Sequence, residues 1–137
     1  MRCVLIVMVA LCAAGAQAIP QYASSRKIPC KTPENSASCY RTRGRLSLAN
    51  GFPSFRLWKI GTKRVFGVYS GPSVFPPRAG LDSESEFPAN VSAVFKPTEN
   101  VLFATFEICP LAPRRPGRMQ PVCIESAKNV FVQPQKN

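Results

Sequence analysis

Hydrophobic and polar residues alternate in short runs along most of the chain after residue 39. In residues 40–49, Leu46 and Leu48 fall on one face and three arginines fall on the other: Arg41, Arg43 and Arg45. A period of two residues is typical of a β-strand that buries one face. The pattern therefore predicts a strand here whose outward face is basic.

Two turn signals divide the next part of the chain. Asn50-Gly51 readily adopts positive φ, and residues 61–63 form a second glycine-containing turn. Residues 54–60 alternate again, and residues 64–69 are rich in Val and Phe. We therefore expect three antiparallel strands joined by short turns, a meander, over residues 40–69.

The second half of the chain predicts further short strands after a long loop. Residues 70–90 carry prolines and glycines and favour a loop, while residues 91–95 and 101–109 have the composition of strands. The run 101–109 is apolar on both faces, which indicates a central, covered strand. Residues 122–132 predict one or two closing strands, with a single helical turn possible at 125–129. Together these runs indicate an all-β fold, a small sandwich or barrel of about six short strands.

The first residues have the pattern of a secretory signal. Arg2 precedes an apolar run, residues 3–14, that is too short to span a bilayer, and Ala16-Gln17-Ala18 is a small-residue cleavage pattern. Lipidation at Cys12 is the competing interpretation, which Leu11 disfavours because a small residue is required before such a cysteine. We expect a signal peptide over 1–18, a polar N-terminal arm over 19–38 and a single β domain over 39–137. The protein would then be secreted, extracellular or, in a bacterium, periplasmic.

Four cysteines remain after the predicted cleavage: Cys30, Cys39, Cys109 and Cys123. In a secreted chain of this size an even number predicts disulfides, here two, with three possible connectivities. Spacing favours the local pairing, Cys30 with Cys39 and Cys109 with Cys123. A zinc site is disfavoured because the chain has no histidine and no Cys-x-x-Cys step.

The chain is strongly basic, with 18 Lys and Arg against 7 Asp and Glu and a formal net charge of +11. Such an excess favours acidic partners: a polyanion or an acidic protein surface. Arginine is suited to this because its guanidinium binds phosphate or sulfate through two parallel hydrogen bonds. A solvated outer sheet face that only keeps the domain soluble is the alternative.

Two arginine clusters are the candidate anion-binding residues. The main patch would lie on the meander, with Lys59 and Lys63 nearby and with Tyr40 and Trp58 available for stacking. A second contact would lie in the proline-rich loop at 110–121. The eight candidates are Arg41, Arg43, Arg45, Arg56, Arg64, Arg114, Arg115 and Arg118.

The absence of histidine excludes the Ser-His-Asp, Cys-His and histidine-based zinc hydrolases. Glu107, between Phe106 and Ile108, could have a raised pKa, although an exposed glutamate paired with an arginine is the plainer interpretation. No nucleotide-binding loop is present. We therefore expect a non-enzymatic protein without cofactor or metal.

Two further stretches carry a resemblance. They are Arg43 to Arg64, with the pattern RGRLS-x2-NG-x-PSFR-x-W-x2-GT-x-R, and Phe106 to Ser126, with FE-x-CP, PG-x-MQ and VC-x-ES. Together they resemble a group of small exported, mostly bacterial hypothetical proteins of unassigned function. The resemblance implies one compact β domain whose second cysteine pair belongs together, and it implies no catalytic residue or ligand.

The sequence therefore predicts a secreted, monomeric binding protein that captures a polyanion or acidic surface. A protein-interaction or structural module is the alternative, acting through loops 70–89 and 110–121 and residues such as Phe75 and Phe87. A host-defence role on anionic membranes would need an exposed apolar patch. Asn90-Val91-Ser92 is a possible glycosylation site.

Overall fold

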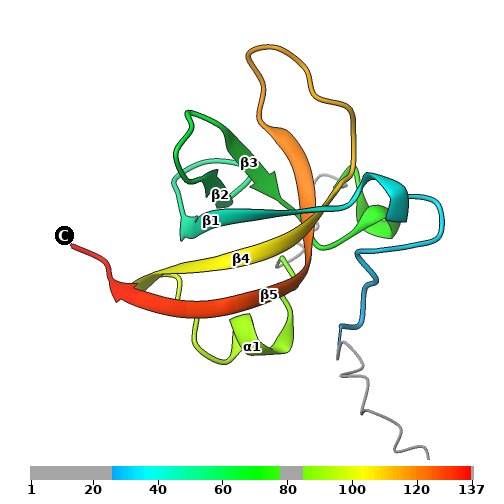
Figure 1. Ribbon diagram of the computed structural model, residues 1–137. Helices are drawn as coiled ribbons and strands as arrows, with labels where there is room; N and C mark the ends of the chain where they lie inside the picture. The colour runs from blue at the N-terminus through cyan, green and yellow to red at the C-terminus, as the bar shows by residue number, and fades with distance from the viewer. Residues whose placement is uncertain (1–25, 78–84, 137) are drawn as a thin grey trace, which may run out of the picture.

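The computed structural model of the chain describes residues 26–77 and 85–136 (Figure 1). Five strands form a closed barrel in the order β1-β2-β3-β5-β4. They are β1 (Tyr40–Leu48), β2 (Phe55–Lys59), β3 (Val65–Val68), β4 (Asn100–Pro110) and β5 (Gln120–Pro134). The predicted all-β class is confirmed, with five strands where about six were expected. The predicted signal peptide and Cys12 lie outside the described residues.

The strands are connected as in a five-stranded Greek-key barrel. β1, β2 and β3 form the predicted antiparallel meander, and β4 pairs antiparallel with both β1 and β5. β5 also runs parallel to β3 through the pairs Phe66–Gln120, Gly67–Pro121 and Val68–Val122. Because β5 enters between β3 and β4, the loop after β4 is brought beside the turn between β2 and β3.

Alternation places the apolar residues of each strand inside the barrel. On β1, Thr42, Gly44 and Leu46 are buried, and the arginines between them point outward. The interior is filled by large side chains that are fully buried: Phe66, Phe106, Leu46, Leu57, Leu102, Ile108 and Ile124. The two faces of the strands are thus separated as the sequence predicts.

The outer face of β4 differs from the prediction. β4 is central, but Val101, Phe103 and Thr105 remain partly exposed rather than covered. Apolar residues on both faces of this strand therefore mark an apolar outer surface rather than a second packed layer.

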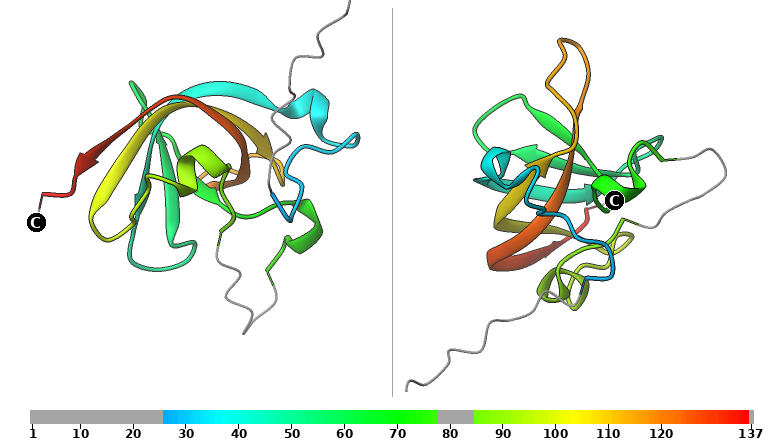
Figure 2. Two further views of the ribbon diagram at one scale, coloured as in Figure 1. Left: turned by 90° about the horizontal axis from the view of Figure 1, so that it is seen from below. Right: turned by 90° about the vertical axis from the view of Figure 1, so that its right-hand side faces the viewer.

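The helical segments are short: η1 (Ser36–Ser38), η2 (Pro72–Val74) and α1 (Ala89–Ser92). The strand predicted at 91–95 is wrong, because α1 and the turn after it occupy these residues. Val91 and Phe95, four residues apart, are both buried, which is helical spacing. α1 lies across one end of the barrel (Figure 2), where Phe95 and Phe87 make edge-to-face contacts with Phe55.

The helical turn proposed at 125–129 is also wrong, because these residues belong to β5. The strand accommodates them through two register shifts against β4, and Asn129 has a φ of 54°. Bulges of this kind let a long strand bend around a barrel.

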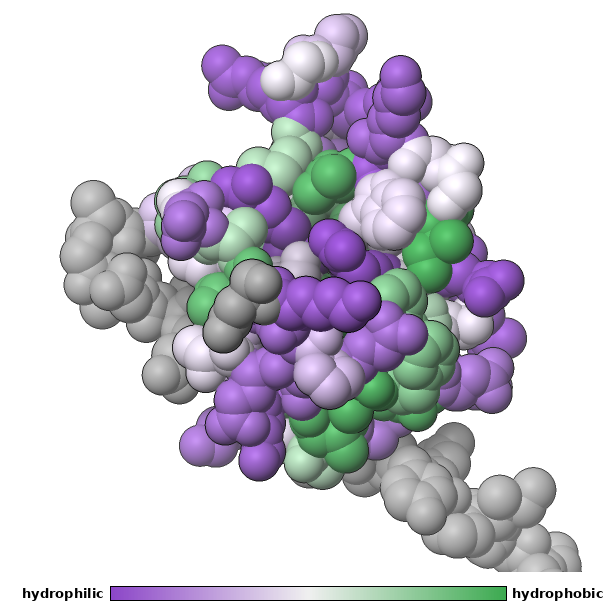
Figure 3. All heavy atoms as spheres, turned by 90° about the vertical axis from the view of Figure 1, so that its left-hand side faces the viewer, coloured by the Kyte–Doolittle hydropathy of each residue, from purple (hydrophilic) through white to green (hydrophobic). Residues whose placement is uncertain are grey.

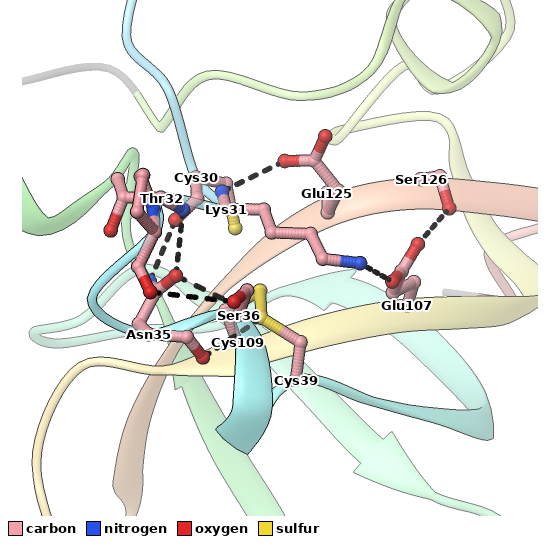
Figure 4. Close-up of polar contacts among 11 residues, drawn as sticks. Cys30, Lys31, Thr32, Asn35, Ser36, Cys39, Glu107, Cys109, Glu125 and Ser126 are labelled. Carbon is pink, nitrogen blue, oxygen red and sulfur yellow. Dashed lines mark hydrogen bonds and ion pairs between the residues drawn. A yellow bond between two sulfur atoms is a disulfide. The ribbon is translucent and has the colours of Figure 1, made fainter.

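The disulfides join Cys30 to Cys123 and Cys39 to Cys109, so the predicted local pairing is wrong. The register explains the second bridge: Tyr40 pairs with Ile108, and continuing that ladder by one residue sets Cys39 opposite Cys109. Cys123 is then bridged to Cys30 from the arm. The three sulfurs that lie within 4.8 Å of one another, those of Cys30, Cys109 and Cys123, all belong to these two bridges. Figure 4 shows the bridge between Cys39 and Cys109.

Arg26 attaches the described part of the arm to the barrel. Its guanidinium donates hydrogen bonds to the carbonyl oxygens of Ser70, Glu86 and Ile124 as well as Ile28. Burial lowers the pKa of Arg26, and the nearby Glu86 and Glu125 carboxylates oppose that effect. The carboxylate of Glu86 also accepts hydrogen bonds from the backbone N–H groups of residues 27 and 28.

Candidate functional site: a basic cleft

An open cleft of about 290 Å³ lies between the turn that follows β2 and the loop that follows β4. Five cationic side chains line it, and no acidic residue does. They come from two segments far apart in sequence, Lys63 and Arg64 from the turn and Arg114, Arg115 and Arg118 from the loop. This concentrates about half of the chain's net charge around one cavity.

The β4–β5 loop projects away from the barrel, as Figure 1 and Figure 2 show. Figure 3 shows mostly hydrophilic side chains at the top of the molecule, the level of this loop in Figure 1. Arg114, Arg115 and Arg118 are exposed. The loop therefore presents its charges to solvent, where a large anion can reach them.

The base of the loop is held in place. The backbone N–H of Leu111 donates to the carbonyl of Pro121 at 2.9 Å, and the N–H of Arg118 donates to the carbonyl of Arg115 at 3.3 Å. Gly117 completes this turn with a φ of 70°, a conformation that other residues rarely adopt. Cys109 and Cys123 flank the loop and are bridged to Cys39 and Cys30, not to each other. An ordered base lowers the cost of fixing the loop on binding.

Arg64 is the most precisely oriented of the five cations. Its Nη2 donates to Oε1 of Gln120 at 3.0 Å, and Gln120 Nε2 donates to the carbonyl of Ala112 at 3.2 Å. The Cζ atom lies 4.8 Å from the ring centroid of Phe66. These contacts leave other N–H groups of the guanidinium available for an anion, since it has five donors.

The structure divides the eight predicted arginines into two groups. Arg64, Arg114, Arg115 and Arg118 lie around the cleft, where Lys63 joins them. Arg41, Arg43, Arg45 and Arg56 lie outside it. The sequence could not assign Arg64 to the loop cluster, because the parallel β3–β5 pair that joins them is a contact between distant segments.

The other arginines have different surroundings. Arg41 pairs across the sheet with Glu107, and Arg45 lies over the ring of Trp58 with Cζ 5.5 Å from its centroid. Arg56 donates to the carbonyl of Asn50 at 2.9 Å and so holds the β1–β2 loop. Of the predicted stacking residues, Tyr40 packs against the core.

Glu107 is an ion-paired carboxylate, and the suggestion that its pKa is raised is wrong. Lys31 Nζ donates to Glu107 Oε1 at 2.7 Å, and Ser126 Oγ donates to Oε2 at 3.1 Å (Figure 4). The hydrogen bond from Lys31 holds the pKa of Glu107 below its ordinary value, despite partial burial. The partner is a lysine of the arm, which spacing along the sequence does not indicate. A lowered pKa does not suit a general acid at neutral pH.

Asn90, the predicted glycosylation residue, lies in α1 and is exposed. Its Nδ2 donates to the carbonyl of Ala127 at 2.8 Å, which ties the helix to β5.

Comparisons with family models, with curated proteins and with solved structures give no match to this chain. Within residues 26–77 and 85–136, the helices are all too short and polar to cross a membrane.

Proposed function

We propose that this protein is a secreted, non-enzymatic binding protein that captures a polyanion in the basic cleft. The observation that carries the proposal is the convergence of five cations, without a carboxylate, on one open cavity. Like charges are brought together at an electrostatic cost, which an anion bridging them would relieve. A surface whose charge served only solubility would intersperse acids among these residues.

Arginine at four of the five positions favours oxyanions. Each guanidinium offers paired N–H groups that match two oxygens of a phosphate or sulfate, while a lysine acts as a single point of charge. Arg64, oriented by Gln120, would provide the fixed contact, and the loop arginines would close over the chain of the ligand. A small β-barrel is compatible with this role, but a fold alone does not assign a function.

The proposal is tested by eluting the oxidised domain with a salt gradient from heparin and, in parallel, from a sulfonate cation exchanger. We expect later elution from heparin. The triple variant Arg114→Gln, Arg115→Gln and Arg118→Gln should lose this difference. A matched variant with the same loss of charge outside the cleft, Lys27→Gln, Arg41→Gln and Lys136→Gln, should keep it. Equal elution of the unmodified protein from both columns would contradict the proposal.

A protein-interaction module is a second candidate, because Phe52 of the β1–β2 loop is exposed and contacts an aromatic residue that follows β3. Phe52 is 69% exposed and makes an edge-to-face contact with Tyr69, which in turn contacts Phe75. Phe87, the other aromatic suggested for such contacts, packs against the core instead. Binding through this cluster would depend little on salt, whereas polyanion binding would fall steeply as salt rises.

A further inference from the structure

A row of five directly opposed residues crosses the outside of the barrel and begins at the basic cleft. Val65 of β3, which lines the cleft, pairs with Trp58 of β2, and Trp58 pairs with Arg45 of β1. Arg45 pairs in turn with Phe103 of β4, and Phe103 with Phe131 of β5. Their neighbours along the strands, such as Leu46, Leu57, Phe66 and Leu102, are buried inside. We call Val65, Trp58, Arg45, Phe103 and Phe131 the outer row.

Planar groups make up most of the outer row. Arg45 lies over the indole of Trp58, and the rings of Phe103 and Phe131 are stacked, with centroids 5.0 Å apart and an interplanar angle of 7°. Phe131 is 53% exposed. Arg45 Nε is buried and has no hydrogen-bond partner among the described residues. A folded domain does not gain stability from an exposed ring or from an unpaired buried donor.

Cations lie on both sides of the outer row. Thr105 lies two residues along β4 from Phe103, a distance of about 7 Å. It pairs with Arg43 of β1 on one side and with Lys128 of β5 on the other. On the opposite side, Arg56 pairs with Ser47. Glu107, one pair beyond Thr105 on the same face, is occupied by Lys31. The row is thus a strip of planar side chains with positive charge along its edges.

We propose that the polyanion is a single-stranded nucleic acid, an inference that rests on the proposed function of the cleft. Its phosphates would bind the cleft and the flanking cations, and its bases would stack on the planar side chains of the outer row. Bases stack on aromatic rings and on guanidinium planes, and such sites combine rings with a basic track. A sulfated glycan has the charges but no planar base to use these rings. A duplex hides the faces of its bases.

The reach of the row suits several nucleotides. Four strand spacings separate Val65 from Phe131, about 19 Å along the sheet at about 4.8 Å each. Single-strand-binding grooves on small β-barrels hold between about 4 and 16 nucleotides. An oligothymidylate of about ten nucleotides is therefore a suitable probe.

The experiment compares that oligothymidylate with an abasic phosphodiester of the same length and charge, using the whole oxidised domain. Trp58 is the only tryptophan in the chain, so tryptophan emission, excited selectively over tyrosine, reports on the surroundings of Trp58 in the row. We expect the oligothymidylate to change the emission of Trp58 and to bind about tenfold or more tightly than the abasic chain. Phe131→Leu should reduce this ratio severalfold without changing abasic binding. Phe52→Leu, which alters a more exposed phenylalanine outside the row, should leave the ratio unchanged.

The outcomes separate this inference from the proposed function. Equal affinities for the two chains, or a ratio that Phe131→Leu does not change, would overturn base stacking and leave polyanion capture standing. Tighter binding of a heparin fragment, with no preference for the oligothymidylate, would assign the cleft to a sulfated glycan and would also overturn the inference. If the loop triple variant bound both chains and heparin as the unmodified protein does, the proposed function would fail as well.

Discussion

The described part of the N-terminal arm (residues 26–38) and the basic cleft both lie beside β4 and β5, yet they differ in whether their charged side chains have partners. In the arm, two of the basic side chains have partners: Arg26 donates to four carbonyls, and Lys31 is bound to Glu107. Two disulfides reinforce these contacts. In the cleft, five cations share one open cavity, and its lining includes no acid.

This difference in charge pairing indicates that the arm contributes to stability and the cleft to binding. A hydrogen-bonded, covalently tied arm adds to the free energy of unfolding, because the disulfides restrict the unfolded chain and the hydrogen bonds satisfy buried groups. The cleft cations repel one another and gain little until an anion arrives. The arm thus supports the strands from which the loop projects, and the loop keeps its charge available.

The largest expected effect on the free energy of unfolding comes from removing a disulfide. Replacing Cys39 and Cys109 together with alanine should lower the free energy of unfolding by about 2 to 5 kcal/mol, because a chain closure of 70 residues is lost. Denaturant unfolding measures this. Peptide mapping of the unmodified protein should recover Cys30 linked to Cys123. A fragment in which Cys109 is linked to Cys123 would contradict the structure.

Arg26 should have the next largest effect. Arg26→Met removes hydrogen bonds to four carbonyls, three of them outside the arm, and should cost about 2 kcal/mol. Lys27→Met is the matched control, since that side chain is exposed, and it should change stability by less than about 0.5 kcal/mol. Similar losses of unfolding free energy for both variants would mean that Arg26 does not anchor the arm.

Glu107 should contribute a small stabilisation of the native state that is lost in acid. Its pKa is lowered in the native state, so between that pKa and the ordinary value of about 4.3 the unfolded chain binds more protons than the native one. The stabilisation is therefore present above that window and is lost as the pH falls through it. Because Lys31 is 41% exposed, we expect less than about 1 kcal/mol. Glu107→Gln should flatten the dependence of unfolding free energy on pH between about 5 and 3. An unchanged slope would exclude Glu107 as its source.

The smallest effect on stability should come from the cleft. The variant Arg114→Gln, Arg115→Gln and Arg118→Gln should unfold within about 0.5 kcal/mol of the unmodified protein, because the side chains of these arginines are exposed. Thermal unfolding at low salt checks this. A loss comparable to that of Arg26→Met would show that the loop supports the fold and would remove the contrast between the two regions.

Local patterns were sufficient for much of the fold. The alternation in β1, the turns around residues 50 and 61, and the continuous apolar run of β4 predicted four strands close to their observed bounds. The prediction failed at 91–95, where Val91 and Phe95 suit either a strand or one helical turn. It also treated the apolar outer face of β4 as covered, although Phe103 lies at the surface.

The candidate site could be predicted only in part. The sequence indicated that the arginines of β1 point away from the core, because they alternate with apolar residues. It could not show that Arg64 belongs with Arg114, nor that Lys63 and Gln120 complete the cleft. These residues are brought together by the parallel β3–β5 pair, which joins segments more than fifty residues apart.

The sequence by itself determined the class of fold, the basic excess and the outward direction of the arginines, since these follow from periodicity and composition. The tertiary structure alone decided the disulfide partners, the pairing of Glu107 with Lys31, the assembly of the cleft and the alignment of the outer row. All four depend on strand register and chain crossing, and those are set by how the whole barrel closes around its core, not by residues adjacent in sequence.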